Sequence, residues 1–151
     1  MSQYKKAVRM LEEVFSILPE DIDLSKGGVG ELALAAHLNH SLVSGDKGAD
    51  AKDSEELLYE YKVSITNQFN FNFGPRKKGF EKVIEKHFDG IAGAYCANRK
   101  GMLITEVFYV PSEVLVPALI IHFNKVSGKQ LTKNYRMESF KALMNENLST
   151  F

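Results

Sequence analysis

Apolar residues recur along the chain with two different periods, which predict where helices and strands lie. Between residues 4 and 18 the apolar positions follow helical spacing, and Pro19 ends the pattern. A second helix with an alanine-rich side is predicted from about Val29 to Leu42. The first helix is expected to pack on the core or on a second copy of the chain, since an apolar stripe usually covers something.

Alternation with a period of two predicts the strands. Residues 57–63 alternate between the two sides of an extended chain, and a short strand is predicted before them at 49–52. Two longer strands, 91–97 and 102–110, are joined by the segment 98–101, whose composition is typical of a β-hairpin. These strands are expected to form one sheet.

The remaining predicted elements are mostly helical. Pro117 is expected to interrupt or restart a short helix at 112–115, and the apolar segment 118–123 fits either a helix or a strand. Residues 125–133 are polar, and no element is predicted there. Further helices are predicted at 78–88 and 138–147. The whole pattern predicts a mixed α/β fold over residues 1–151, in which helices flank a central mixed β-sheet.

Composition limits the classes of protein that the chain can belong to. Its 151 residues suffice for one domain, and 44% apolar and 25% charged residues are ordinary for a soluble globular protein. No apolar run is long enough to cross a bilayer, and the N-terminus lacks the apolar region of a signal peptide. Cys96 is the only cysteine, so an intracellular, reducing location in the cytoplasm is expected.

The net charge of zero counts against a nucleic-acid-binding protein without excluding one. Such proteins usually carry a basic surface, but acidic groups can gather at a metal site while basic groups line a groove. Residues 76–78 and 99–100 are local basic clusters that fit this separation.

Acidic and basic side chains meet on the predicted strand 57–63. Glu60 and Lys62 are two residues apart, so they lie side by side on one face of the sheet. The preceding turn allows Asp50 to return beside them, and its small neighbours favour it over the competing acids Asp46 and Asp53. Two carboxylates and an ammonium suit a Mg²⁺ site, because hard oxygen ligands bind this ion.

This arrangement resembles the Asp…Glu-x-Lys signature of the PD-(D/E)xK nuclease superfamily, and it is most similar to the small type II restriction endonucleases. Asp50 is followed at the expected distance by Glu60-Tyr61-Lys62, although Ala49 stands where the name of the signature has proline. The order of elements extends the resemblance over roughly residues 28–143. It implies a restriction-endonuclease-like core and a Mg²⁺-dependent DNA endonuclease, with Mn²⁺ able to substitute.

The resemblance also implies roles for individual residues. Asp50, Glu60 and the backbone carbonyl of Tyr61 would hold one or two Mg²⁺ ions, and Lys62 would orient the attacking water and stabilise the transition state. In this superfamily a glutamate on the preceding helix often points at the metal site, which would give Glu31 a catalytic role. Alternatively, Glu31 simply favours the dipole of the helix whose first turn it occupies.

A segment rich in phenylalanine and amides follows the predicted strand. Its side chains alternate, so an extended chain places aromatic groups on one side and amides on the other. Amides suit adenine edges, whereas arginine and lysine suit guanine edges and phosphates. The alternative is an edge strand whose phenylalanines are in the core and whose amides face water. The predicted DNA-binding residues are Asn67, Gln68, Asn70, Asn72, Arg76, Lys77 and Lys78.

Several alternatives stay open at this point. Symmetric cutting of double-stranded DNA would require a homodimer, for which the first helix is a candidate surface. A repair or recombination nuclease of the same superfamily would share the chemistry but cut by structure. In a non-catalytic α/β binding module, Glu60 and Lys62 would form a surface ion pair. His37 and His40 have a spacing that permits metal binding, but no third ligand is nearby.

Overall fold

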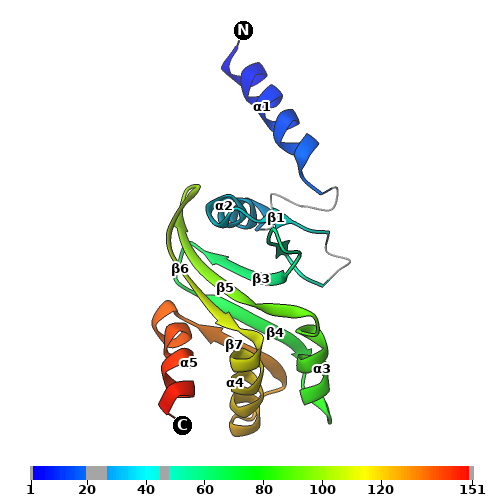
Figure 1. The fold of residues 1–151 in the computed structure, drawn as a ribbon, viewed down its shortest axis with the longest axis vertical. Helices are drawn as coiled ribbons and strands as arrows, with labels where there is room; N and C mark the ends of the chain where they lie inside the picture. Colours follow the sequence, from blue (N-terminus) through cyan, green and yellow to red (C-terminus); the bar gives the residue numbers. More distant parts are fainter. Residues whose placement is uncertain (1, 20–26, 45–47, 150–151) are drawn as a thin grey trace.

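A mixed five-stranded sheet forms the centre of the protein (Figure 1). The structure is a computed structural model that describes residues 2–19, 27–44 and 48–149. The neighbouring strands β3 and β5 are parallel, and the other pairs in the sheet are antiparallel. In spatial order the strands are β1 (Ser41–Leu42), β2 (Ala51–Lys52), β3 (Leu58–Ser64), β5 (Ile91–Lys100) and β6 (Leu103–Pro111).

Helices cover both faces of this sheet, as the sequence predicts. One face carries α2 (Gly28–Leu38), and the opposite face carries most of the remaining elements (Figure 1). Those elements are α3 (Phe80–His87), α4 (Ser112–Lys125), α5 (Met137–Ser149) and a two-stranded antiparallel ribbon of β4 (Phe69–Pro75) and β7 (Gln130–Tyr135). The predicted α/β fold class is thereby confirmed.

The layer between α2 and the sheet is rich in aromatic side chains. The ring of His40 stacks on Tyr59 at 4.9 Å between centroids, and His40 Nδ1 lies 2.8 Å from the hydroxyl oxygen of Tyr61. At Gly30 the helix approaches the sheet so closely that an added Cβ would lie 3.0 Å from Val63. Because α2 packs this closely on β3, its first turn is held beside that strand.

The opposite face of the sheet covers the larger apolar core. Phe69, Phe71 and Tyr135 point inward from the ribbon and pack with residues of α3, α4 and α5. Glu60 and Lys62 belong to this face, since the register of β3 alternates them with the tyrosines that face α2. A buried carboxylate therefore enters a largely apolar layer.

Helix α1 (Gln3–Ile17) lies away from this body, and Figure 1 shows it beyond α2. The helix begins where the hydroxyl oxygen of Ser2 accepts a hydrogen bond from the backbone N–H of Lys5. None of its residues is buried, so in this structure its apolar side does not pack on the core.

The structure differs from the prediction in three places. The second helix ends at Leu38 because Asn39 adopts a positive φ of 57°, and Ser41–Leu42 form β1 instead of continuing the helix. Pro117 lies inside the continuous helix α4, where burial of Leu115 and Leu119 offsets the missing hydrogen bond. Strand β7 occupies part of the polar segment for which no element is predicted.

No helix in the described part of the chain combines the length and apolar character that crossing a bilayer requires.

Candidate functional site

Asp50 lies where the pairing of β2 with β3 ends. Its backbone N–H donates to the carbonyl of Tyr59 at 3.0 Å. Its carboxylate Oδ2 then accepts the backbone N–H of Tyr61 at 2.8 Å. The side-chain carboxylate thus takes the place of the backbone acceptor that a longer β2 would offer to the N–H of Tyr61.

The carbonyl of Tyr61 faces the same edge of β3. In an extended strand the N–H and C=O of one residue point to the same side, and the N–H of Tyr61 is bonded to Asp50. The carboxylate of Asp50 and the carbonyl of Tyr61 are therefore on the same edge of β3, where the pairing with the shorter strand β2 has ended.

Glu60 and Lys62 adjoin this edge on the core-side face of β3. Glu60 is only 8% exposed, and its Oε1 lies 3.3 Å from the ammonium of Lys62. Its Oε2 lies 3.5 Å from Nε2 of His87, at the end of α3. The ammonium of Lys62 also lies over the ring of Phe71, 5.2 Å from the centroid. Both groups are thus held by neighbours and are not extended into solvent.

Glu31 from α2 interacts electrostatically with Asp50, Glu60 and Lys62. Burial, together with the charges of Asp50 and Glu60, raises the pKa of Glu31 to about 7, against the opposite effect of Lys62. Burial and the charge of Glu60 raise the pKa of Asp50 to about 6, against the hydrogen bond from Tyr61. Three acids and one lysine therefore interact across a partly desolvated space.

Glu60 behaves differently from the other two acids. Burial would raise its pKa, but the hydrogen bond from His87 and the charge of Lys62 outweigh burial and hold the pKa below its usual value. Glu60 is therefore the carboxylate that stays ionised most readily, and its charge adds to the cost of ionising Asp50 and Glu31.

The chemistry of the donors fits a hard divalent cation. Carboxylates and a carbonyl are the ligands that Mg²⁺ prefers, and excess negative charge is what such an ion would neutralise. Within residues 2–19, 27–44 and 48–149, no group of three or more His, Cys, Asp or Glu side chains is placed so that it could hold a metal ion. The metal-binding roles of Asp50, Glu60 and the carbonyl of Tyr61 therefore stay predictions.

The competing acids have other positions. Asp53 holds its own loop, since Oδ1 accepts the backbone N–H groups of Glu55 and Leu57 and Oδ2 accepts the hydroxyl of Tyr59. Asp46 lies outside the described residues. Two histidines fall within the predicted second helix. In the structure His37 is on α2 and exposed, whereas His40 lies after the end of α2 and belongs to the aromatic layer.

The residues predicted to bind DNA divide into two groups. Arg76 donates three hydrogen bonds to backbone carbonyls at the end of α4 and the loop after it, and Asn67 Oδ1 accepts from Asn98 and from the backbone of Met137. These bonds are structural, and the DNA contacts of the two residues stay predictions. The other predicted residues are exposed: Gln68, Asn70, Asn72, Lys77 and Lys78.

The polar face of the ribbon contains residues that the sequence analysis does not select. Asn70 pairs with Asn134 and Asn72 with Thr132, so these four exposed side chains lie on one face. The alternation of apolar and polar residues along 130–135 is the signal that could have identified β7. His87 is also absent from the predicted site, and its contact with Glu60 has no counterpart in sequence spacing.

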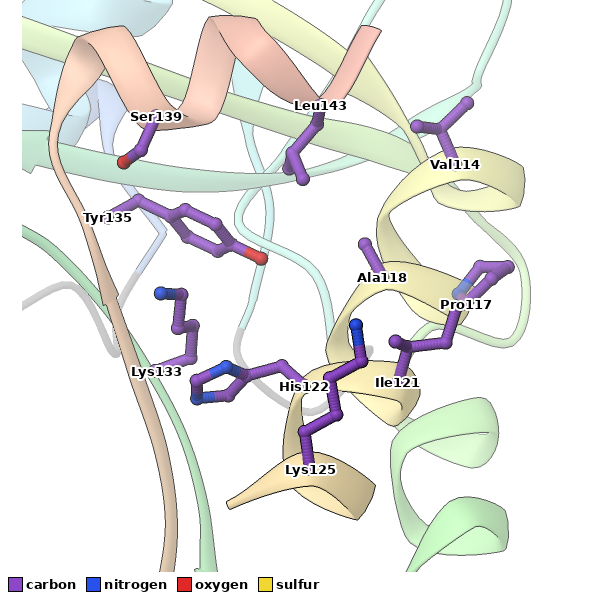
Figure 2. A pocket seen from close by; sticks show the side chains of 10 residues that line it. All are labelled: Val114, Pro117, Ala118, Ile121, His122, Lys125, Lys133, Tyr135, Ser139 and Leu143. Carbon is purple, nitrogen blue, oxygen red and sulfur yellow. The ribbon is translucent and has the colours of Figure 1, made fainter. Parts of the chain in front are cut away.

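A cavity of about 420 Å³ lies between α4, β7 and α5 (Figure 2). It shares no lining residue with the group of carboxylates. Figure 2 shows the basic side chains of His122, Lys125 and Lys133 around a common space, with an apolar wall on α4. The cavity is therefore separate from the site that contains Asp50 and Glu60.

No protein-family model matches the sequence, and no curated protein matches it significantly. The chemistry of the site is therefore inferred from the residues themselves and from their geometry.

Proposed function

We propose that the protein is a divalent-metal-dependent DNA endonuclease that hydrolyses phosphodiester bonds, of the type II restriction kind. The observation that supports this proposal is the electrostatic interaction of Asp50, Glu31 and Glu60 with one another and with Lys62, which contacts Glu60 directly. A protein gains no stability from such a group without a counter-ion, because burial raises the pKa of both Asp50 and Glu31.

Asp50, Glu60 and the carbonyl of Tyr61 are the residues that would hold Mg²⁺ or Mn²⁺. When bound, the ion supplies Lewis-acid stabilisation of the phosphate and of the leaving oxygen. The chain itself fixes the donors: the backbone of Tyr61 orients Asp50, and His87 and Lys62 orient Glu60. Glu31 closes the group from α2.

Lys62 has the geometry for a role at the reacting phosphate. Its ammonium is held beside Glu60 and above Phe71, while its side chain keeps 28% of its surface exposed. A cation so placed can orient a water molecule and stabilise negative charge that develops on phosphate oxygens. Its pairing with Glu60 keeps this charge at the edge where Asp50 lies.

The polar face of the ribbon is suited to contacts with bases. The major groove of DNA admits a two-stranded β-ribbon, and asparagine pairs with the adenine edge through two hydrogen bonds. Asn70 and Asn134 are exposed cross-strand neighbours on that face. Lys77 and Lys78 follow β4 and are exposed, which suits contacts with phosphates.

The burial of Glu60 disfavours the non-catalytic alternative. In a binding module, Glu60 and Lys62 would form an exposed pair, which costs little and contributes little. A carboxylate that is 8% exposed has lost most of its hydration, and this cost needs a compensating role.

Incubation of supercoiled plasmid and phage DNA with the protein, with Mg²⁺ or with EDTA, tests the proposal. We expect cutting only with the metal ion, and we expect Lys62→Ala to abolish cutting while DNA binding, measured with Ca²⁺, is retained. Lys52→Ala is the matched control, because Lys52 forms an exposed i,i+4 pair with Glu56. Equal cutting by Lys62→Ala and the wild type would contradict the role of Lys62, and no cutting by the wild type with any divalent ion would contradict the function.

The products distinguish the two kinds of nuclease. Discrete fragments indicate cutting at a specific sequence, whereas a smear or junction-specific products indicate a repair or recombination nuclease. Symmetric cutting of both strands would use two copies of the chain, one for each strand.

A further inference from the structure

Strand β7 carries a lysine at a position that faces the core. Leu131, Lys133 and Tyr135 occupy the inward positions of this strand, and Lys133 is half-buried between its two buried neighbours. An ammonium that loses part of its hydration destabilises the fold unless an acidic group compensates it. Within residues 2–19, 27–44 and 48–149, no Asp or Glu forms a salt bridge with Lys133.

The neighbours of Lys133 are aromatic or basic. Its ammonium lies 5.0 Å from the centroid of the Tyr135 ring, which is a cation–π contact. Burial lowers the pKa of His122 on α4, and the charge of Lys133 lowers it as well. The imidazole of His122 is therefore neutral near pH 7 and can still form a hydrogen bond, while the positive charge of Lys133 stays uncompensated.

These groups line the cavity between α4, β7 and α5 (Figure 2). Its volume of about 420 Å³ is within the range of roughly 300–1,000 Å³ that is usual for small-molecule sites. Lys125 adds a second ammonium, and no Asp or Glu of the described residues lines the cavity. Another part of the wall is apolar and consists mainly of Val114, Ala118 and Ile121 of α4 and Leu143 of α5.

We propose that this cavity binds a small organic anion, whose phosphate or carboxylate group lies between Lys125, Lys133 and His122 and whose apolar body packs on the wall formed by α4 and α5. Ammonium groups suit the oxygens of both anions, and burial of the apolar body adds to the affinity. The cavity shares no lining residue with the carboxylates around Asp50, so this binding is independent of the proposed nuclease function.

The apolar wall favours a small molecule over duplex DNA. The outer surface of DNA is dominated by charged phosphates, which would not cover apolar side chains. The face of the ribbon that is proposed to contact bases also points the other way. Asn134 stands between Lys133 and Tyr135 on β7, so its side chain projects from the opposite side of the strand.

Titration of the isotope-labelled, full-length chain with phenyl phosphate in EDTA, followed by amide NMR spectra, tests the proposed site. We expect shifts at residues 121–125, 133–135 and 139–143 and none at residues 60–62, with a dissociation constant of about 0.1–10 mM. Benzoate should shift the same amides, and the tighter of the two probes identifies the preferred anion. Inorganic phosphate and benzyl alcohol each lack one half of the ligand, so each should bind at least about tenfold more weakly.

Variants separate the cavity from general attraction by charge. Lys133→Gln should weaken the binding of phenyl phosphate about tenfold or more. Lys129→Gln is the matched control, because Lys129 is exposed in the segment before β7, does not line the cavity and loses the same charge. Ala118→Leu fills the apolar wall without a change of charge, so it should weaken phenyl phosphate while inorganic phosphate binds as before. Unchanged amide positions away from the cavity confirm that each variant is folded.

Three results would overturn the assignment. The first is the absence of shifts from either aromatic probe up to about 10 mM, and the second is equal weakening by Lys133→Gln and Lys129→Gln. The third is a short DNA duplex that shifts the cavity amides when phenyl phosphate does not, which would assign the cavity to DNA. No step measures cleavage, so failure here is distinguishable from failure of the proposed function.

Discussion

Replacement of Asp50 by asparagine should stabilise the metal-free protein at neutral pH. The pKa of Asp50 is raised from 3.8 to about 6 by burial and by the charge of Glu60. Since the folded-state pKa lies above the unfolded value, the folded chain binds more protons between these two pH values. The free energy of unfolding therefore falls as the pH rises through this window, and the loss persists above about pH 6.

The size of the effect follows from the same shift. A difference of 2.2 pKa units, from 3.8 to about 6, corresponds to an upper limit of about 3 kcal/mol. Two effects reduce this limit: the titration of Asp50 is coupled to that of the neighbouring acids, and the amide of the asparagine must fit where the carboxylate lies. We therefore expect the free energy of unfolding to rise by about 1–2 kcal/mol. The asparagine oxygen can still accept the backbone N–H of Tyr61, so that hydrogen bond is kept.

Urea unfolding of the wild type and of Asp50→Asn in EDTA, from about pH 4.5 to pH 8, measures this effect. The chain has no tryptophan, so unfolding is followed by far-UV circular dichroism. We expect the stability difference to grow with pH and to level off above about pH 6. Mg²⁺ should stabilise the wild type more than the variant at pH 8, since the variant loses a carboxylate ligand.

Asp53→Asn is the control for this experiment. The hydrogen bond from Tyr59 and two backbone N–H groups lower the pKa of Asp53, so its ionised form contributes stability that is present above the unfolded pKa. The control should therefore lose stability at neutral pH, opposite to Asp50→Asn. A stability gain from Asp50→Asn that does not change with pH, or no gain at pH 8, would refute the electrostatic reasoning.

Three further predictions concern the scaffold and the ribbon. Gly30→Ala should destabilise the protein by about 1–3 kcal/mol in urea unfolding, because the new Cβ would lie 3.0 Å from Val63, whereas Gly128→Ala meets only ordinary contacts at 3.7 Å and should be nearly neutral. Arg76→Ala should lower stability by about 1–3 kcal/mol, since its guanidinium bonds three backbone carbonyls; an unchanged unfolding midpoint would contradict a structural role. Asn134→Ala should leave the melting temperature unchanged and weaken specific DNA binding by about 1–3 kcal/mol. If the variant kept the wild-type preference for target over competitor DNA, a role of Asn134 in base contacts would be excluded.

Local patterns predicted the parts of the fold that depend on neighbouring residues. The alternation along 57–63 identified β3. A short return of the chain was expected to bring Asp50 beside Glu60 and Lys62, and in the structure the carboxylate of Asp50 accepts the backbone N–H of Tyr61, which lies between those two residues. The helical spacing of residues 4–18 likewise gave α1 almost to its ends. The two-residue period of the strand and the 3.6-residue period of the helix are both set by the local backbone geometry.

Contacts between distant segments were not predictable in the same way. His87 reaches Glu60 only because α3 returns against the sheet, and Arg76 bonds carbonyls about fifty positions along the chain. The end of α2 depends on one residue, Asn39, with a positive φ. The alternation along residues 130–135 is interrupted by Lys133, which stands at an inward position between Leu131 and Tyr135. A short polar strand of this kind needs the partner β4 to form, and pairing between distant strands is not encoded in a local pattern.

The position of the carboxylates follows from the shortness of β2. This strand pairs with β3 over only two residues, so beyond Tyr59 the edge of β3 would otherwise have an unpaired backbone N–H at Tyr61. The carboxylate of Asp50 satisfies that N–H, and in doing so it brings negative charge to the edge that the carbonyl of Tyr61 faces. A longer β2 would provide a backbone acceptor instead and would cover that carbonyl. The early end of β2 therefore leaves the carboxylate of Asp50 and the carbonyl of Tyr61 on one edge of β3, and the cost of placing the acids close to one another is what a bound cation would offset.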